Sequence, residues 1–553
     1  MAGIFKNLNS FFTYKANQRE EFELLEGADE KASQENNSAT HVESAIEERL
    51  SKDIGVNLAK IKQQLNVPKN QDILIREFKL EEKIGAFIVF IEEMADGTTI
   101  NDFILRPLLM PEHTAEYLKR HKKGELIDYI WNNVLAINQA KKEKEFRNII
   151  KKVLDGGTAL FIDGYEECLL IESQGYEKRG IEAPKTENVI RGPHEGFNEN
   201  LRTNISLIRK IVRNEDLIVE FLPIGKKSQI SCAVLYMEKV TNPNIVKEVK
   251  RRIQNIDIDL VMGAGVLEEM IADQPYRMLP QILTTERPDR AAILLIVGKV
   301  IFMVEGTPFA SAVPINFWEC LRSPEDYFLK WHAATFLRIL RLFALLITLL
   351  LPGLYLALTL FHQEMIPTDL LAAIAFSREN IPFPAVLELV MMELAFEFIR
   401  EGGLRVPGIL GQTLGIIGAL ILGQAAVSAQ IVSPILIIVV AVGGIASFAI
   451  PSYELSFSIR LLRFGFIFLA AIAGFYGISA GIILLGVMSV SIKSFGVPIF
   501  SPIAPKTRAN QDVIASLPVF MQKGRPDALN PLDRKKGGNP IRRWMQYKGG
   551  NKP

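Results

Sequence analysis

The chain has 553 residues, and 63 Lys and Arg residues against 62 Asp and Glu residues give it a formal net charge of +1. This balance argues against a general nucleic-acid-binding protein, which carries a basic excess. The three cysteines lie far apart and form no CxxC pair, so neither a disulfide framework nor a common zinc site is expected. No Walker A loop, HExxH helix or GxSxG elbow occurs, and we therefore expect no enzyme, no cofactor and no metal.

Residues 1–65 are polar and predict a largely disordered tail, with room for a short helix around residues 56–65. Met1 to Ser10 carries one Lys and no long apolar stretch, so we expect no secretory signal and a cytoplasmic start.

Two α/β subdomains are predicted next, over residues 66–190 and 191–325. Alternating and buried apolar runs, amphipathic periods and turn residues support this division. In the first subdomain we expect strands at 72–78 and 84–91, helices at 111–121 and 141–154, and a hairpin around Asp163-Gly164. In the second we expect helices at 199–213 and 243–255 and strands at 217–222, 231–237, 291–298 and 299–305.

The region of residues 326–505 predicts an all-α membrane domain. No Asp, Glu, Lys or Arg occurs at the 48 positions between Arg405 and Glu454, and about 20 apolar residues suffice for one span. An interfacial helix over 325–341 leads into spans at 342–361, 407–429 and 431–450, and into a long segment at 461–492 that a break near Gly474 could fold into a hairpin. The count is about five to six.

A basic tail, residues 506–553, follows the membrane domain. Lys and Arg mark the cytoplasmic side of a membrane, so an even count of about six spans places both the N-terminal domain and this tail in the cytoplasm. If residues 384–401 lie in the interface instead, four or five spans remain.

The segment 384–401 is apolar but rich in carboxylates. Glu393, Glu397, Arg400 and Glu401 share one helical face, which cannot meet lipid. One interpretation makes Glu393 and Glu397 part of a pore ring that concentrates cations. The other pairs them with Arg400 and Arg405 or places them on the polar face of a surface helix.

Two further groups of residues are candidates. Gln424, Val427 and Gln430 lie near the end of a span and are pore or gate candidates, after a small-residue run (Gly411, Gly415, Gly418) that favours close helix packing. Arg191, His194, Glu195 and Asn198 lie in a glycine-rich loop that leads into a helix. That loop pairs no nucleophile with a base, so a structural loop at the joint between the two subdomains is the preferred interpretation.

Over about residues 70 to 505 the chain resembles the A subunits of spore germinant receptors, the GerA family, and seven sequence blocks, in order between residues 191 and 505, carry the resemblance. They are RGPHEGFNE (191–199), VGKVIFMVEGTPF (297–309), LPGLY (351–355), IPFPA (381–385), GQAAV (423–427), IVSP (431–434) and FSPIAP (500–505). The polar start and the basic tail lie outside the resemblance.

The resemblance implies a multi-pass protein of the spore inner membrane, with two cytoplasmic α/β subdomains. It implies a homo-oligomer, a pentamer, that acts as a nutrient-gated cation channel and triggers germination by releasing ions. The implied partners are a B subunit that senses the nutrient, a C subunit that is a lipoprotein, and membrane lipid. It implies no catalytic residue. A non-conducting signalling scaffold and a secondary transporter, the latter hinted at by a helix break at Pro352-Gly353, remain the alternatives.

Overall fold

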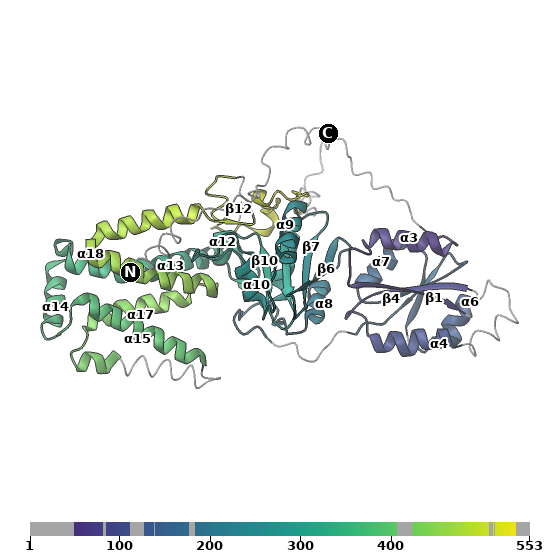
Figure 1. The fold of residues 1–553 in the computed structure, drawn as a ribbon, viewed down its shortest axis with the longest axis horizontal. Coiled ribbons are helices and arrows are strands. Elements are labelled where there is room, and N and C mark those ends of the chain that lie inside the picture. Colours follow the sequence, from purple (N-terminus) through teal and green to yellow (C-terminus); the bar gives the residue numbers. More distant parts are fainter. Residues whose placement is uncertain are drawn as a thin grey trace, which may run out of the picture.

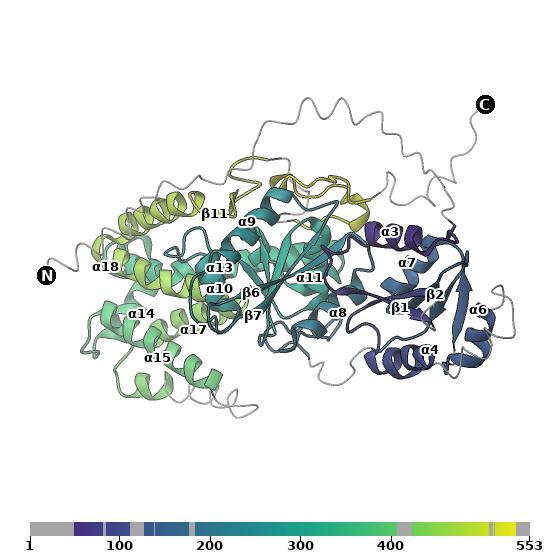
Figure 2. The same ribbon diagram turned by 45° about the vertical axis from the view of Figure 1, so that its right-hand side comes forward.

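The computed structural model describes residues 49–80, 84–110, 126–137, 139–175, 183–405, 423–507, 513 and 515–537. Three parts follow one another along the long axis of the molecule (Figure 1). They are a bundle of apolar helices, a β-sheet unit in the middle (the second unit, residues 183–327) and a β-sheet unit at the far end (the first unit, residues 49–175). The view turned by 45° keeps this order (Figure 2). The second unit therefore links the first unit to the helices.

The first unit is built on a five-stranded sheet in which all neighbouring strands are antiparallel. The strand order is β1-β2-β4-β5-β3, with bounds β1 (Ile73–Leu80), β2 (Ile84–Ile91), β3 (Ala140–Glu143), β4 (Thr158–Ile162) and β5 (Cys168–Ile171). One face is covered by α3 (Ile54–Gln64) and α7 (Phe146–Leu154), the other by η1 (Thr99–Leu105), α4 (Arg106–Leu109), α6 (Leu126–Tyr129) and η3 (Ile130–Val134). Strands covered on both faces read as continuous apolar runs, as β2 does.

The expected strands and the Asp163-Gly164 hairpin of the first unit are confirmed. The predicted helix at 141–154 is wrong in its first part, because residues 140–143 pair with β5 as an edge strand. The end of the tail is not disordered, because Ile61 and Leu65 are fully buried in the core. The short helix for which the sequence left room around residues 56–65 is confirmed as α3. The expected helix at 111–121 lies outside the described residues.

The second unit repeats this topology without repeating the sequence. Its strand order is β6-β7-β9-β10-β8, with bounds β6 (Leu217–Ile224), β7 (Ile230–Met237), β8 (Leu283–Thr285), β9 (Val300–Val304) and β10 (Ala310–Val313). Its helices are α8 (Leu201–Ile211), α9 (Pro243–Gln254), α10 (Ala264–Ile271), α11 (Pro288–Val297) and α12 (Phe317–Cys320). Counted within each unit, both sheets have the order 1-2-4-5-3, with a helix before strand 1 and another between strands 3 and 4. The β-rich plan shared by the two expected subdomains is thus one topology used twice.

The predicted strand at 291–298 is wrong, because residues 288–297 form helix α11. Ala291, Ala292, Leu294 and Leu295 are all buried, so the helix has no polar face in this stretch. Periodicity cannot distinguish a short buried helix from a buried strand. Gly298 ends α11 in the left-handed conformation with φ +104°, and β9 follows as expected.

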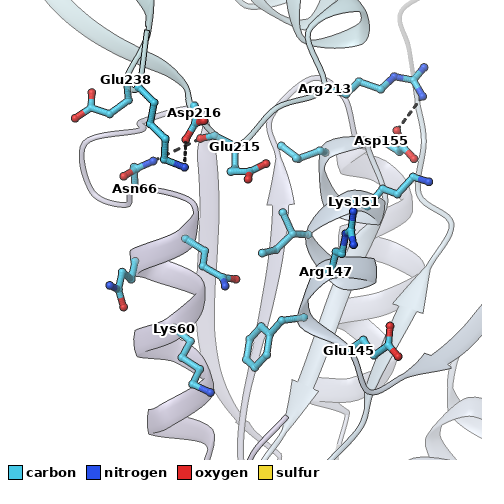
Figure 3. Close-up of a pocket in the computed structure, with 16 residues that line it drawn as sticks. Lys60, Asn66, Glu145, Arg147, Lys151, Asp155, Arg213, Glu215, Asp216 and Glu238 are labelled. Atoms are coloured by element: carbon cyan, nitrogen blue, oxygen red, sulfur yellow. Dashed lines mark hydrogen bonds and ion pairs between the residues drawn. The ribbon is translucent and has the colours of Figure 1, made fainter. Parts of the chain in front are cut away.

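A buried ion pair joins the two units. Arg209 of α8 donates from Nε and Nη2 to the carboxylate of Asp72, at 2.7 and 2.9 Å, and both side chains are almost fully buried. Asn70 accepts from Arg209 Nη2 and from the backbone N–H of Val219, which fixes the start of β1 beside β6. Next to this joint a groove of about 1210 Å³ opens between α3, α7 and the second unit, lined by charges of both signs (Figure 3).

The helical bundle follows the second unit. Its helices are α13 (Trp331–Leu360), α14 (Thr368–Arg378), α15 (Ala385–Arg405), α17 (Pro434–Phe448) and α18 (Tyr453–Val490), with short turns η4 (Pro324–Tyr327) and η5 (Gln363–Met365). Among the described residues, α13 and α18 are long and apolar enough to cross a membrane, and α17 is a shorter apolar helix. An α/β region followed by membrane-type helices is therefore confirmed. The count of five to six spans stays a prediction.

Helix α18 is a hairpin of two helical arms. Ala473 and Gly474 have non-helical dihedral angles, and the chain then turns back. Gly477 lies against the carbonyl oxygen of Leu469, and a Cβ at Gly481 would lie 3.0 Å from the ring of Phe466. Residues 466 and 481 would be about 22 Å apart in a straight helix. The break expected near Gly474 is confirmed, and it reverses the chain.

Helix α13 is continuous. The separate interfacial helix expected over 325–341 is wrong, because η4 is followed by one unbroken helix from Trp331 to Leu360. The break expected at Pro352-Gly353 is also absent from this helix. Gly353 instead allows close packing, since a Cβ there would lie 3.3 Å from the carbonyl oxygen of Phe466.

The chain after α18 returns to the second unit. It forms β11 (Lys493–Ser494), β12 (Val497–Pro498), η6 (Val519–Met521) and η7 (Asp527–Leu529). Arg525 donates from Nε to the carbonyl oxygen of Ile296, and the N–H of Leu532 donates to the carbonyl oxygen of Val240, both at 2.9 Å. The described part of the expected basic tail therefore packs along the second unit.

Candidate functional site

The carboxylates of α15 face the arginines of α18. Glu393, Glu397 and Arg400 recur at i, i+4 and i+7, so they share one side of α15. Arg460 and Arg463, three residues apart on α18, lie opposite them. We call these five residues the ion cluster. Two carboxylates and three guanidinium groups thus meet inside the helical bundle.

The ion cluster is held by short contacts. Arg463 Nη2 lies 2.7 Å from Glu393 Oε2 and 3.2 Å from Glu397 Oε1. Arg460 Nη1 donates to Glu397 Oε2 at 2.5 Å. Arg400 lies 3.4 Å from Glu397 and donates to the hydroxyl oxygen of Ser447 on α17 at 2.7 Å. The cluster therefore ties together α15, α17 and α18.

The ion cluster is buried but not fully paired. The side chains of Glu393 and Arg463 have no exposed surface, whereas 24% of the Glu397 side chain is exposed. Within the described ranges, Nε and Nη1 of Arg463 have no hydrogen-bond partner. Burying a charge is costly unless it is paired and hydrogen-bonded. The cluster therefore holds one more cation than anions, and some of its buried guanidinium donors have no acceptor among the described residues.

Glu388 belongs to a different site. It pairs with Arg378 of α14 at 3.2 Å and accepts from the backbone N–H of Ser433 at 3.1 Å. Nine residues of helix separate Glu388 from Glu397, about 13.5 Å along the axis. The two carboxylate sites therefore lie at different heights in the bundle.

Of the candidates Gln424, Val427 and Gln430, the last lies three residues before Ser433, whose backbone N–H donates to Glu388, so Gln430 lies near the Glu388 site. Residues 423–428 are helical, Gln424 and Gln430 are exposed, and Val427 is half-buried. Gln430 has φ +54° and ends this helical turn. The small-residue run at 411–418 lies outside the described residues. The structure does not bring these three residues together with Glu393 and Glu397.

The loop with Arg191, His194, Glu195 and Asn198 belongs to the second unit. Arg191 and His194 are exposed. Glu195 pairs with Lys210 at 2.8 Å. Asn198 exchanges hydrogen bonds with Asn204, which closes the loop onto α8. Among the described residues, the joint to the first unit is made instead by Asn70, Asp72 and Arg209, which the sequence analysis missed.

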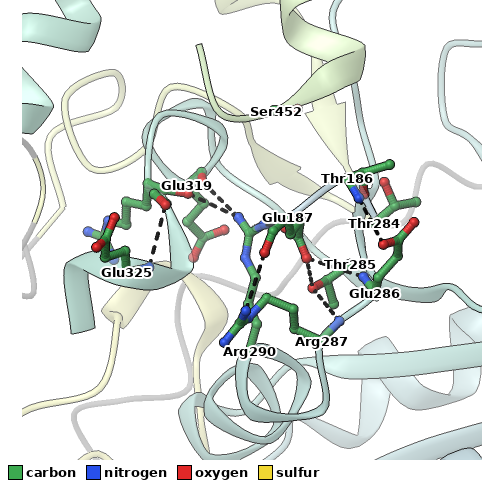
Figure 4. A network of polar contacts seen from close by, with 12 residues as sticks. Thr186, Glu187, Thr284, Thr285, Glu286, Arg287, Arg290, Glu319, Glu325 and Ser452 are labelled. Carbon is green, nitrogen blue, oxygen red and sulfur yellow. Dashed lines mark hydrogen bonds and ion pairs between the residues drawn. The ribbon is translucent and has the colours of Figure 1, made fainter. Parts of the chain in front are cut away.

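A buried polar network lies beside this loop (Figure 4). Glu187 accepts from Arg290 of α11 and from the hydroxyl group of Thr285. Burial lowers the pKa of Arg290, but the Glu187 carboxylate more than offsets this and holds it above its ordinary value. Lys299 donates to Glu319, and burial still keeps the pKa of Lys299 below its ordinary value. The sequence analysis did not single out these residues, and only Lys299 lies in an element that it predicted, the strand at 299–305.

The network continues to the membrane-type helices through Asp326. This fully buried carboxylate accepts from Arg341 at 2.7 Å and from Arg338 at 3.2 Å. Arg341 also donates to the carbonyl oxygen of Leu321. The first turns of α13 are therefore pinned to the second unit. Arg338 and Arg341 lie in the segment 325–341, which the sequence predicts as an interfacial helix, and the structure instead pairs them with a buried carboxylate.

No metal-binding constellation is found in the part of the chain that the structure describes: no three His, Cys, Asp or Glu side chains converge there. Cys168, Cys232 and Cys320 are all buried and free. Burial raises the pKa of the Cys232 thiol to about 12, so it stays protonated at neutral pH. A buried, protonated thiol is a poor nucleophile.

The chain combines a large α/β region with a bundle of apolar helices, two of which are long and apolar enough to cross a membrane, and comparison with known proteins adds its family. The family model described as Bacillus/Clostridium GerA spore germination protein matches residues 59–528. This match extends past residue 505, so part of the segment that we placed outside the resemblance belongs to it. The chain belongs to the GerA family of spore germination proteins.

Individual relatives agree with this assignment. The chain is 38% identical to spore germination protein KA of Bacillus subtilis, over 89% of this chain and 90% of that protein. It is 37% identical to spore germination protein GerLA of Bacillus cereus, over 86% and 95%. It is also 37% identical to the uncharacterized membrane protein YfkQ of Bacillus subtilis, over 84% and 90%. The crystal structure of the N-terminal domain of the A subunit of the Bacillus megaterium spore germinant receptor GerK3 is 26% identical, with a TM-score of 0.39, over 49% of this chain and 97% of that one.

Proposed function

We propose that this chain is the membrane subunit of a nutrient-sensing spore germinant receptor, and that its oligomer is a gated cation channel. The single observation that carries the channel is the ion cluster, in which Glu393 and Glu397 lie among apolar helices. Ionisable groups in such helices are costly to bury and mark ion pathways or relays. Family membership supports the receptor role.

The proposed assembly is a homo-oligomer, a pentamer, in the spore inner membrane, with a nutrient-sensing B subunit and a lipoprotein C subunit. An even count of six spans is consistent with the hydrogen bonds that join the second unit to both ends of the α18 hairpin. Thr284 of the second unit donates to Glu454 at the start of α18. Gln281 accepts from Ser494 just after the second arm of α18. Both ends of this hairpin therefore lie on the side of the soluble units, which supports one common side for the N-terminal domain and the tail. The basic residues of the tail favour the cytoplasm as that side.

The ion cluster suggests how the channel is gated. With Glu393 sealed from solvent and paired to Arg463, a cation cannot reach its carboxylate. Conduction past Glu393 therefore requires α15 to move relative to α18. Glu397 is the member that solvent already reaches. We further propose that Gln424, Val427 and Gln430 line a second constriction of the pathway, near the Glu388 site and away from the ion cluster.

Single-channel recording in planar bilayers tests the proposal, with the protein alone and then with its B and C partners plus nutrient. We expect nutrient-dependent, cation-selective steps. Glu397→Gln should reduce the preference for cations, because it removes the exposed charge of the cluster. The matched control is Glu379→Gln, an exposed glutamate near the end of α14, which should leave selectivity unchanged. Normal currents from an assembled Glu393→Gln/Glu397→Gln double variant would remove both residues from the pore.

A non-conducting signalling scaffold is the second candidate, and the complete burial of Glu393 and Arg463 favours it. In this role the ion cluster only holds α15 and α18 together, and the second unit passes the signal through Asp326. Silence from a verified complex with both partners and nutrient would support the scaffold. Discrete currents would exclude it.

A further inference from the structure

A cavity of about 300 Å³ lies where α10 of the second unit meets the first turn of α18. Two glutamates line it, Glu268 from α10 and Glu454 from α18. One belongs to a soluble unit and the other to a membrane-type helix. In the ion cluster each carboxylate has an arginine partner. Here, within the described residues, neither carboxylate has an ion-pair partner.

The sheet of the second unit brings the two glutamates together. Ser311 of β10 and Thr284 of β8 are direct cross-strand partners, so their side chains are neighbours on one face. The Ser311 hydroxyl donates to Glu268 Oε1 at 2.5 Å, and the Thr284 hydroxyl donates to Glu454 Oε1 at 3.3 Å. Each carboxylate thus receives one hydrogen bond from a neutral group. Neither bond offsets the repulsion between two negative charges.

The other charged groups around the pair do not neutralise it. On the same helix, Glu269 is exposed and adds negative charge. In the loop after α10, Arg277 lines the cavity but, among the described residues, makes no ion pair with either glutamate, and Asp273 is paired with Arg252. On α18, Tyr453 is exposed. On α12, burial is the main cause and the charge of Glu454 the second cause that raises the pKa of the Cys320 thiol to about 12, so this thiol stays neutral.

We propose that Glu268 and Glu454 form a proton-sharing pair that fastens the second unit to the first turn of α18 and loosens this contact when both ionise. One proton allows a carboxyl group to donate to its neighbour, which removes the repulsion. Burial raises the pKa of Glu268, so the docked state binds more protons than the undocked state. The contact is therefore tightest below the ordinary Glu pKa of about 4.3 and weakens as the pH rises through the raised value.

Hydrogen exchange of the full-length protein in lipid nanodiscs tests this proposal, after correction for intrinsic exchange rates. Peptides that cover α10 and residues 453–460 are followed from pH 5 to pH 8.5. We expect their protection to fall about tenfold for each unit by which the pKa of the pair is raised. In the double variant Glu268→Gln/Glu454→Gln, protection should stay high and independent of pH. Each single variant should keep only the smaller pH dependence that burial of its remaining glutamate causes. Glu454→Lys, which creates an ion pair with Glu268, should keep protection high at pH 8.5.

Two controls make the test specific. Glu269→Gln changes the adjacent residue on the same helix, and Glu305→Gln changes an exposed residue after β9. Both should keep the pH dependence of the unmodified protein. Protection that is flat with pH in the unmodified protein would overturn the proposal, as would an equal effect of Glu269→Gln. The readout needs no ion current, so it is independent of the proposed channel.

Discussion

The two sheet units share one strand order but bury the corresponding helix to different extents. Helix α7 of the first unit buries Phe146, Ile149, Ile150 and Val153, which form a single stripe, and its other side faces solvent. Helix α11 of the second unit is buried on most sides. The same topology therefore holds a half-exposed helix in the first unit and a helix buried on most sides in the second. The segments that pack around each helix cause the difference.

The neighbours differ because the second unit lies in the middle of the molecule. Helix α8 packs against α11, and the C-terminal segment binds the end of α11 through Arg525 and Ile296. The start of α11 carries Arg290, which binds Glu187 from the connection between the units. Helix α7 has solvent where α11 has protein. The difference shows that the second unit is built to join parts, and the following predictions sharpen or break this comparison.

The largest effect is expected for Arg290→Leu. The substitution leaves the buried carboxylate of Glu187 without its arginine, which should cost about 3–5 kcal/mol. Native-state hydrogen exchange of β9 and β10 measures this loss. The double variant Arg290→Leu/Glu187→Leu should recover most of it, since two apolar groups then replace the pair. A cost below about 1 kcal/mol for the single variant would contradict the buried pair.

The next effect is expected at the joint between the units, for Asp72→Ala. It leaves the buried guanidinium of Arg209 without its carboxylate, but Asn70 still accepts from Arg209 Nη2. The cost should lie at the lower end of the range for a broken buried pair, about 3 kcal/mol. Exchange of amides in β1 and β6 should increase together. An increase confined to β1 would show that the ion pair does not couple the units.

A smaller effect is expected for Ala291→Leu in α11. Ala291 has no exposed surface, so three added carbon atoms overpack the interface with the sheet, at about 1–3 kcal/mol. Exchange at α11 and β9 reports the loss. The matched control is Asn148→Leu, on the exposed side of α7. If both substitutions cost the same, the two helices do not differ in burial as described.

The smallest effect is expected for Lys151→Ala in α7. Lys151 is exposed at the edge of the groove between the units, so its removal should change the free energy of unfolding by less than about 0.5 kcal/mol. The same exchange measurement on α7 and β4 tests this. A loss above about 1 kcal/mol would mean that the groove is closed around this side chain in solution.

Sequence reading worked best where a pattern is local. The strands at 73–80 and 84–91, the Asp163-Gly164 turn and the break near Gly474 each carry their signal within a few residues. It failed at α11 and at residues 140–143. A helix covered on most sides loses its period, and an edge strand is defined by its partner β5 and not by its own residues.

Part of the ion cluster could be predicted from a local pattern, and part of it could not. The helical period placed Glu393, Glu397 and Arg400 on one face of α15, and the structure retains that face. It could not show that Arg460 and Arg463, more than sixty residues away in the chain, meet those carboxylates. The pairing depends on how α15 and α18 pack. Whether Glu393 and Glu397 line a pore stays a prediction.

The sequence by itself determined the class of this protein: a charged α/β region, a long apolar region and the motif blocks of the GerA family. Composition and short motifs carry this information, because burial in a membrane and tight turns constrain neighbouring residues directly. Only the tertiary structure decided which charges are paired, that the two units share one topology, and that Glu268 and Glu454 line one cavity without an ion-pair partner among the described residues. These properties arise from contacts between distant segments, which leave no period or motif along the chain.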